Sequence, residues 1–378
     1  MKASILRRTA PRFRSGRAAA SLVVAALAAL LLALGSAAGC GGSSGTTTTA
    51  PVPAASDTTV APDTTAPVVT EGVPAPEVAE IDLIMDWVPW VLDIPIDVAQ
   101  AKDFYADAGL TVTQTIPTSP TDVVKFVSTG KSQFGLYYAP DVLMARAEGA
   151  PVLSVAALMG HAPLGLALTP GFSAVTPADL VGKTVAVPLI PSVRASYDAM
   201  LKAGGVDPAA VTLVDPGFDL VAPLLTGTYD AVAFTAFGEL VEADLASDVE
   251  LAYLDFRDWG SPDYAFMNVI TSSDFSAENP NTVRAFVAAT LAGLDYAATH
   301  PEEAVDIYIA AHPEFDRDTL LAQWEATIPS LALASGGTPA GAQDEAAWQT
   351  LHDWMIGVGL LAAPLDVAPA LTNDFLPR

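Results

Sequence analysis

The alternation of strand-like and helix-like segments constrains the fold of this 378-residue chain more than any other feature. Short apolar runs are each followed by a longer segment with helical periodicity. In the first half of the chain this pattern predicts strands at 81–86, 110–116, 133–138 and 152–158, and helices at 96–108, 121–129 and 140–148. Repeated strand–helix units of this kind place helices against a mostly parallel sheet.

The pattern restarts after residue 164. Strands are predicted at 184–187, 211–214, 231–235 and 250–254, with helices at 192–203, 219–226 and 238–246. After an apolar run at 265–270 the chain is predicted to be helical, at 281–299, 301–311, 316–328 and 342–357. The composition, 51% apolar and 16% charged, is ample for a large buried core. We therefore expect a globular body with two α/β sheets in series and a helical C-terminal part.

The N-terminal segment has the features of an export signal. A basic segment up to Arg17 precedes an apolar run at 18–34, and small residues lead to Cys40, the only cysteine. A lone cysteine after Ala38-Gly39 resembles the lipobox of bacterial lipoproteins, in which this cysteine is lipidated. Ordinary secretion or a retained anchor are the alternatives. We expect a signal peptide at 1–39 and a disordered tether rich in Thr, Pro and Ala at 40–79.

The charge of the chain excludes one class of partner. The formal net charge is −26, and six of the 17 basic residues lie in the leader. Removing the leader leaves 11 basic side chains against 43 acidic ones, a formal charge of about −32. Such a field repels phosphate backbones, so nucleic-acid binding is excluded as the main role.

The loop after the first predicted strand is the best candidate for a ligand contact. It carries two carboxylates, two indoles and a proline, namely Asp86, Asp93, Trp87, Trp90 and Pro89. In open α/β sheets small molecules bind beyond the carboxyl ends of strands. The indoles could stack on a ring and the carboxylates could accept hydrogen bonds, although one indole could equally be core. Asp97 has a simpler explanation as an acid in the first turn of a helix.

Catalytic motifs are largely absent from the sequence. It has no nucleotide-binding glycine fingerprint, no phosphate loop and no His-Glu-x-x-His. Ser128 to Lys131 matches Ser-x-x-Lys, but the partner motifs of penicillin-recognising enzymes are missing, and a helix ending at Gly130 explains the match better. The four histidines are scattered, so neither a metal site nor a cofactor is expected. Only His161, just past a predicted strand, is placed near a possible site.

An ordered set of motifs resembles the NMT1/THI5-like family of ABC-transporter substrate-binding proteins. The matching segments are 86–89 (Asp-Trp-Val-Pro), 98–105, 108–112, 134–138 with Asp141, 145–152, 179–185, 300–304, 354–355, 359–360 and 371–377. The resemblance implies the type II periplasmic-binding fold, with two α/β lobes, a two-stranded hinge and a ligand cleft between the lobes. The implied arrangement is a first lobe at 80–165, a second lobe at 166–268 and a return to the first lobe at 269–378. Hinge crossings are expected near 164–169 and 265–271.

The resemblance also implies a function. Family members resemble receptors for the pyrimidine precursor of thiamine, and related ones receive riboflavin or other small organic molecules. Carried over by position, the ligand contacts would be Asp86, Trp87, Pro89, Tyr138, His161, Pro188, Ser192, Phe234, Glu239, Asp263 and Tyr264. Trp90, Asp93 and the proline-rich turn at 187–192 depart from the family pattern. These changes make the cleft more apolar, so a larger or more apolar ligand than the thiamine pyrimidine is possible.

The predicted role is therefore a lipid-anchored receptor on the outer face of the cell membrane. It would close its lobes over a small aromatic heterocycle and pass it to an ABC permease and its ATPase. A pyrimidine synthase of the same fold is disfavoured, because such enzymes use a loop histidine and a cysteine-rich motif, and this chain has neither. A sensor that has lost transport is the third alternative.

Overall fold

The computed structural model describes residues 74–119, 121–188, 190–217, 220–247 and 250–377. These residues all belong to one compact unit, Thr64–Arg378. The predicted signal peptide, Cys40 and nearly all of the predicted tether lie outside the described residues. Across the described ranges, no helix is both long enough and apolar enough to cross a membrane.

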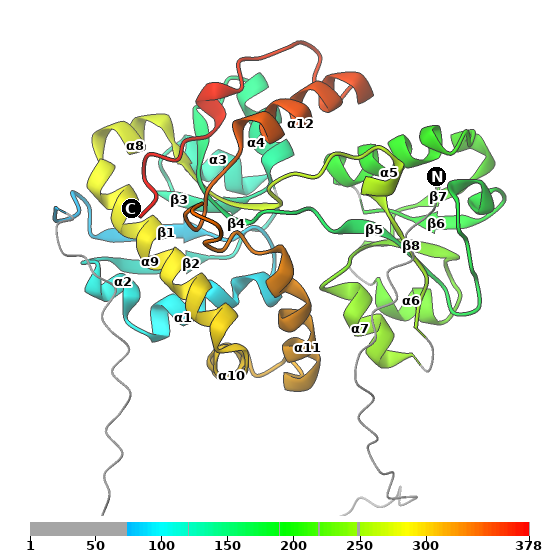
Figure 1. Ribbon diagram of the computed structural model, residues 1–378, viewed down its shortest axis with the longest axis horizontal. Helices are drawn as coiled ribbons and strands as arrows, with labels where there is room; N and C mark the ends of the chain where they lie inside the picture. Colours follow the sequence, from blue (N-terminus) through cyan, green and yellow to red (C-terminus); the bar gives the residue numbers. More distant parts are fainter. Residues whose placement is uncertain (1–73, 120, 189, 218–219, 248–249, 378) are drawn as a thin grey trace, which may run out of the picture. The chain divides into compact units, whose positions relative to one another are not determined.

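The first sheet has five strands in the order β2-β1-β3-β10-β4 (Figure 1). Its strands are β1 (Glu80–Ile84), β2 (Thr111–Thr115), β3 (Phe134–Tyr137), β4 (Val152–Met159) and β10 (Met267–Ser272). β1 pairs with β2 and β3 in parallel, whereas β10 runs antiparallel to both β3 and β4. The predicted mostly parallel sheet is correct for four strands, and the fifth is antiparallel because it arrives from the other sheet.

The second sheet repeats this arrangement in the order β7-β6-β8-β5-β9. Its strands are β5 (Leu164–Leu168), β6 (Thr184–Ala186), β7 (Thr212–Val214), β8 (Ala231–Thr235) and β9 (Tyr253–Asp255). β6 pairs in parallel with β7 and β8, and β5 runs antiparallel to β8 and β9. We call the first sheet with its helices the first lobe, and the second sheet with its helices the second lobe.

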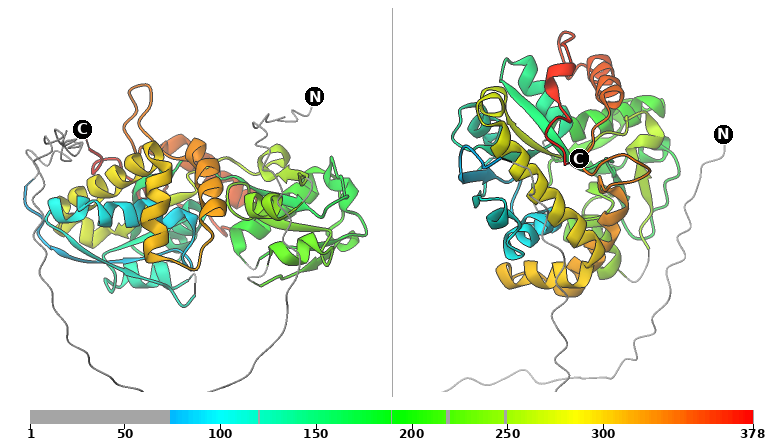
Figure 2. Two further views of the ribbon diagram at one scale, coloured as in Figure 1. Left: turned by 90° about the horizontal axis from the view of Figure 1, so that it is seen from below. Right: turned by 60° about the vertical axis from the view of Figure 1, so that its left-hand side comes forward.

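Helices cover both sheets, as the turned views show (Figure 2). The first lobe has α1 (Ile94–Ala101), α2 (Phe104–Asp107), α3 (Asp122–Ser128) and α4 (Ala139–Ala147). The second lobe has α5 (Pro191–Ala203), α6 (Val221–Leu225) and α7 (Glu239–Ala246). The C-terminal part adds α8 (Ser273–Glu278), α9 (Pro280–Thr299), α10 (Pro301–Ala311), α11 (Arg317–Thr327) and α12 (Glu345–Val358). The helix predicted at 96–108 is two helices, because Asp103 adopts a left-handed backbone with φ of 59°.

The long helix α9 packs into the core of the first lobe, as its apolar periodicity predicts. Phe286 stacks on Phe134 with ring centroids 4.0 Å apart and on Tyr105 at 5.4 Å. α9 also approaches α1 closely, since a Cβ added at Gly293 would lie 2.3 Å from the carbonyl oxygen of Pro95. Only glycine allows this close contact between the two helices.

The chain crosses between the sheets twice, at residues 160–163 and 260–266. Both crossings come a few residues earlier than the predicted segments 164–169 and 265–271, which mostly form β5 and β10. The predicted lobe boundaries at 165/166 and 268/269 likewise fall inside these two strands. The reason is that β5 and β10 are themselves short apolar runs, which the sequence does not distinguish from a linking segment.

Candidate ligand-binding site

A cavity of about 900 Å³ lies between the two lobes. Most of its lining is apolar or aromatic, as is usual for sites that bind small organic molecules. The first lobe contributes Trp87, Trp90, Ser119, Thr121, Val124, Tyr137, Tyr138, Asp141, Met144, Ala145 and Glu148. The second lobe contributes Leu164, Pro188, Ile190, Pro191, Ser192, Val193, Gly217, Leu220, Val221, Ala222, Leu225, Ala233, Phe234, Thr235, Glu239, Glu242 and Ala246. Tyr264 and Phe266 of the second crossing complete the lining.

The loop after β1 forms one wall of the cavity through its indoles. Asp86 is fully buried behind this wall and does not line the cavity. Its Oδ1 accepts a hydrogen bond from Trp90 Nε1 at 3.3 Å, and its Oδ2 accepts one from the Tyr138 hydroxyl at 2.6 Å. Asp86 therefore fixes two aromatic side chains that do line the cavity. Pro89 is half-buried and lies outside the lining.

Asp93 supports the same wall from a second position. It is buried, and its Oδ2 accepts a hydrogen bond from the backbone N–H of Trp90 at 3.1 Å. Burial and the nearby Asp86 carboxylate raise the pKa of Asp93 well above its ordinary value. The pKa of Asp86 is raised to about 6, because burial outweighs the hydrogen bonds from Tyr138 and Trp90. The two acids predicted as ligand contacts thus hold the loop in place.

Asp97 lies further from the cavity, in the first turn of α1. Its Oδ1 accepts a hydrogen bond from Gln114 Nε2 at 2.6 Å, and its Oδ2 lies 3.2 Å from His312 Nε2. This carboxylate joins α1 to β2 and to the end of α10. The structural explanation given for Asp97 from the sequence agrees with these contacts.

The second lobe presents a smoother, more apolar wall. Pro188 and Ser192 lie in the turn between β6 and α5, and Phe234 lies on β8. Glu239 begins α7, and its Oε2 accepts hydrogen bonds from the backbone N–H and the hydroxyl of Thr235 at 3.0 and 2.5 Å. Its carboxylate is therefore largely occupied within the protein.

Aromatic rings of the two lobes meet beside the cavity. Trp90 of the first lobe and Phe237 of the second have ring centroids 5.8 Å apart. Phe266 lies 4.9 Å from the Tyr138 ring and 6.3 Å from the Phe237 ring. These distances are typical of favourable aromatic pairs. A flat ligand in the cavity would have aromatic faces available from both lobes.

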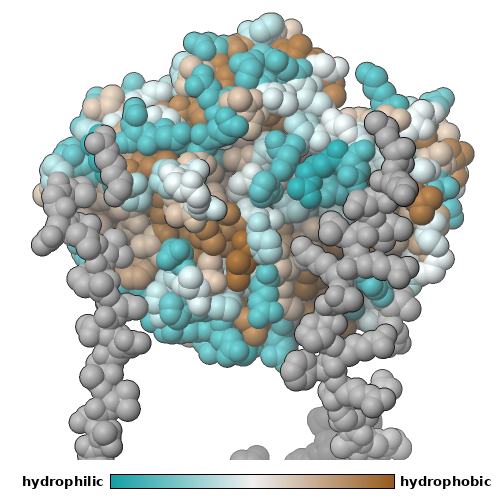
Figure 3. All heavy atoms as spheres, in the orientation of Figure 1, coloured by the Kyte–Doolittle hydropathy of each residue, from teal (hydrophilic) through white to brown (hydrophobic). Residues whose placement is uncertain are grey.

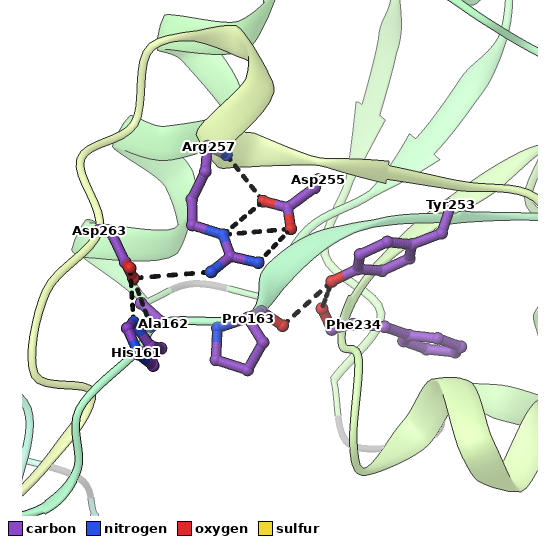
Figure 4. Close-up of polar contacts among 8 residues, drawn as sticks. All are labelled: His161, Ala162, Pro163, Phe234, Tyr253, Asp255, Arg257 and Asp263. Atoms are coloured by element: carbon purple, nitrogen blue, oxygen red, sulfur yellow. Dashed lines mark hydrogen bonds and ion pairs between the residues drawn. The ribbon is translucent and has the colours of Figure 1, made fainter. Parts of the chain in front are cut away.

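His161 and Asp263 lie at the crossings and do not line the cavity (Figure 4). His161 Nδ1 is 2.6 Å from Asp263 Oδ2, and the backbone N–H of Ala162 donates to Asp263 Oδ1 at 3.1 Å. Arg257 Nη1 approaches the same carboxylate at 3.7 Å. This cluster joins the two crossing segments to each other. Close by, the Tyr253 hydroxyl donates to the carbonyl oxygens of Pro163 and Phe234 at 3.1 and 3.0 Å.

The structure thus divides the predicted site residues into two groups. Those that line the cavity are Trp87, Trp90, Tyr138, Pro188, Ser192, Phe234, Glu239 and Tyr264. Those that lie behind the wall or at the crossings are Asp86, Pro89, Asp93, His161 and Asp263. The sequence does not single out Asp141, which lies in the first turn of α4, the helix that follows β3.

Asp141 is the most unusual polar group in the lining. It lies in the first turn of α4 and is 9% exposed, and its buried Oδ2 has no hydrogen-bond partner among the described residues. Burial raises the pKa of its carboxyl to about 7. Elsewhere in the described part of the chain, no group of three or more His, Cys, Asp or Glu side chains is placed to hold a metal ion.

The outer surface differs from this lining. On the face shown in Figure 3, hydrophilic residues dominate the upper and lower edges, and hydrophobic residues gather between them. The excess of acidic over basic residues in the sequence accounts for a hydrophilic exterior.

Residues 93–304 match the model of the family described as NMT1/THI5 like. The chain belongs to this family. It is 30% identical over 319 residues to the riboflavin-binding protein RibY of Chloroflexus aurantiacus, covering 80% of this chain and 87% of RibY. It is 28% identical over 298 residues to the formylaminopyrimidine-binding protein of Halalkalibacterium halodurans, covering 78% of this chain and 89% of that protein.

Enzymes are also among its relatives. The 4-amino-5-hydroxymethyl-2-methylpyrimidine phosphate synthase THI13 of Saccharomyces cerevisiae is 28% identical over 257 residues, covering 65% of this chain and 75% of the synthase. For the fold, the periplasmic aliphatic sulphonate binding protein SsuA of Escherichia coli superposes with a TM-score of 0.62 at 13% identity, covering 78% of this chain and 97% of SsuA. The predicted type II periplasmic-binding fold is confirmed.

Proposed function

We propose that this protein is an extracytoplasmic solute receptor of an ABC importer that binds a small aromatic heterocycle. The observation that carries the proposal is the cavity of about 900 Å³ lined by aromatic side chains from both lobes. Stacking on an aromatic side chain contributes about 1–3 kcal/mol per base-like ring. Relatives that bind a formylaminopyrimidine and riboflavin support the same class of ligand.

Closure of the lobes is the proposed binding motion. A ligand held by rings of both lobes favours the closed arrangement, because it gains contacts from both walls only when they approach. Besides the crossings, the lobes meet at Trp90 and Phe237 and where α11 packs on α7, beside which Gln323 Nε2 donates to the carbonyl oxygen of Gly238 at 3.1 Å. These few contacts could re-form at each closure.

The proposal includes delivery of the ligand to a membrane permease. The lipid on Cys40 and the tether at 40–79, both predicted from the sequence, would keep the receptor at the outer face of the cell membrane. Roughly 40 residues of flexible chain reach about 30–40 Å on average. A sensor of the same ligand would have the same cavity, so the cavity does not distinguish a sensor from a transport receptor. Deletion of the gene should abolish uptake of the ligand if the protein serves transport, and should leave uptake intact if it serves sensing.

A synthase role has less support. Asp93 stands in this chain where the family's loop histidine is expected, and its carboxylate accepts a hydrogen bond from the backbone N–H of Trp90. The sequence has one cysteine, Cys40, and therefore no cysteine-rich motif. The buried acids of this loop hold aromatic side chains. We therefore favour binding without chemistry.

Isothermal titration calorimetry with thiamine pyrimidines, flavins and nucleobases tests the proposed function. We expect at least one aromatic heterocycle to bind, and Trp90→Ala to weaken it about tenfold or more through loss of stacking. Trp90→Phe keeps a ring and should recover most of this loss. Trp354→Phe, on α12 and outside the cavity lining, is the matched control and should bind normally. Absence of binding by every heterocycle would overturn the proposal.

A further inference from the structure

Asp141 is a buried acid, and one of its two carboxylate oxygens has no hydrogen-bond partner among the described residues. This oxygen, Oδ2, is shielded from water. Burying an ionised carboxylate without a partner is costly, and native proteins rarely retain one without a reason. Here the carboxylate lines the cavity, so a bound molecule can supply what the protein does not.

The tyrosines around Asp141 do not satisfy it. The Tyr138 hydroxyl donates to Asp86, on the other side of the wall. Tyr137 and Tyr264 are near enough for Asp141 to raise the pKa of each phenol, yet neither hydroxyl forms a hydrogen bond with it in the described structure. None of these three phenols therefore donates a hydrogen bond to the Asp141 carboxylate.

The charges along the cavity all have one sign. Its described lining contains four carboxylates and no Lys, Arg or His side chain. Asp141 and Glu148 belong to the first lobe, and Glu239 and Glu242 to α7 of the second. Burial and the neighbouring Glu239 carboxylate raise the pKa of Glu242. A ligand anion would face repulsion from both walls, whereas a cation would reduce repulsion between them.

We propose that Asp141 pairs with a positively charged nitrogen of the ligand, so that the cavity selects cationic aromatic heterocycles over neutral or anionic ones of the same shape. This inference rests on the proposed function and names the charge class of its ligand. The aromatic rings would hold the flat ring system, and the carboxylate would supply a charge-assisted contact. A metal ion is a poorer occupant, because no set of three ligating side chains converges in the described residues.

A series of quinoline probes that differ in charge tests this inference on the full-length protein in detergent. Calorimetry at pH 8 would compare 1-methylquinolinium, which carries a fixed positive charge, with neutral quinoline and anionic quinoline-4-carboxylate. We expect the cation to bind about tenfold or more tighter than quinoline, and the anion to bind more weakly than quinoline.

Two variants assign the preference to Asp141. In Asp141→Asn the preference for the cation should fall below about threefold, while quinoline binds as before and so reports an intact cavity. Asp107→Asn removes an exposed carboxylate of the first lobe that does not line the cavity, and it should keep the preference. Retention of the preference in Asp141→Asn would overturn the inference.

The same series separates this inference from the proposed function. If wild-type protein binds the three probes with equal affinity, an aromatic cleft is present and the role of Asp141 is refuted. If none of the three probes binds and no other aromatic heterocycle does, the proposed function fails and the inference fails with it.

Discussion

Asp86 and Asp141 are two buried acids of the first lobe that have different hydrogen-bond partners. Asp86 lies in the loop after β1, and Asp141 lies in the first turn of α4, the helix that follows β3. Burial raises the pKa of both carboxyls, to about 6 for Asp86 and about 7 for Asp141. Asp86 nevertheless accepts hydrogen bonds from Trp90 and Tyr138, whereas Oδ2 of Asp141 accepts none from the described residues.

This difference separates a supporting acid from one available to a ligand. The carboxylate of Asp86 is used by the protein, and its effect reaches the cavity through the two rings that it positions. Oδ2 of Asp141 has no such partner among the described residues. Burial is thus shared by both residues, and the partners of each carboxylate distinguish their roles.

The largest change in the free energy of unfolding is expected when Asp86, the supporting acid, is removed. Asp86→Ala should lower the free energy of unfolding by about 2–4 kcal/mol, because the Tyr138 hydroxyl and the Trp90 N–H lose their acceptor. Urea denaturation at pH 8 measures this change. Asp86→Asn retains an acceptor oxygen and should lose less. An Asp86→Ala protein as stable as wild type would contradict the supporting role.

Asp141→Asn is expected to change the free energy of unfolding in the opposite direction. At pH 8 this variant should be more stable than wild type by about 2 kcal/mol, because it removes a buried charge whose Oδ2 has no partner among the described residues. The pKa of Asp141 is about 7 in the folded state and lower in the unfolded state. At pH values between these two pKa values, the folded state therefore binds a proton that the unfolded state has lost. Stability from this group therefore falls as pH rises from about 4 to 7.

Urea denaturation at pH 5 and pH 8 checks this second expectation. At pH 5 the folded wild-type carboxyl is protonated and resembles the amide, so the advantage of Asp141→Asn should shrink. An equal or lower stability of the variant at pH 8 would mean that Asp141 has a partner within the protein. The contrast with Asp86 would then disappear.

The smallest change in stability is expected at the exposed pair of His161 and Asp263 in the crossings. His161 and Asp263 have side chains 54% and 41% exposed, and exposed ion pairs contribute about 0–1 kcal/mol. His161→Ala should change the free energy of unfolding by less than about 1 kcal/mol and should leave heterocycle affinity nearly unchanged. Titration calorimetry and urea denaturation of one preparation test both statements. A tenfold loss of affinity would restore His161 as a ligand contact.

The sequence predicted the strands and helices well because their periodicity is strong. It also placed Trp90 and Tyr138 at the cavity, Trp90 through the loop that follows the first strand and Tyr138 through the family resemblance. It could not tell that Asp86 is satisfied, because its donor Tyr138 lies 52 residues away. Asp141 belongs to a family motif, but an acid in the first turn of a helix is common for other reasons, so the sequence alone does not indicate a ligand contact there.

Parts of the fold were less predictable for physical reasons. The helix α8 begins at a cap, where the Ser272 hydroxyl accepts a hydrogen bond from the Phe275 N–H, and it has too few residues to show periodicity. The short helix α6 supplies apolar residues to the cavity, including Val221 and Leu225. Apolar side chains on such a helix are ordinary core in most proteins, so the pattern alone does not indicate a ligand.

The placement of β10 has a consequence for the order in which the protein folds. All strands of the second sheet lie within residues 164–255, so this sheet can complete its pairing once that segment has been made or exported. The first sheet cannot, because β10, at 267–272, stands between β3 and β4. Pairing across such long sequence separations is slow. We expect the second sheet to form first, and chains that end before residue 267 to leave β4 without a neighbour in its sheet.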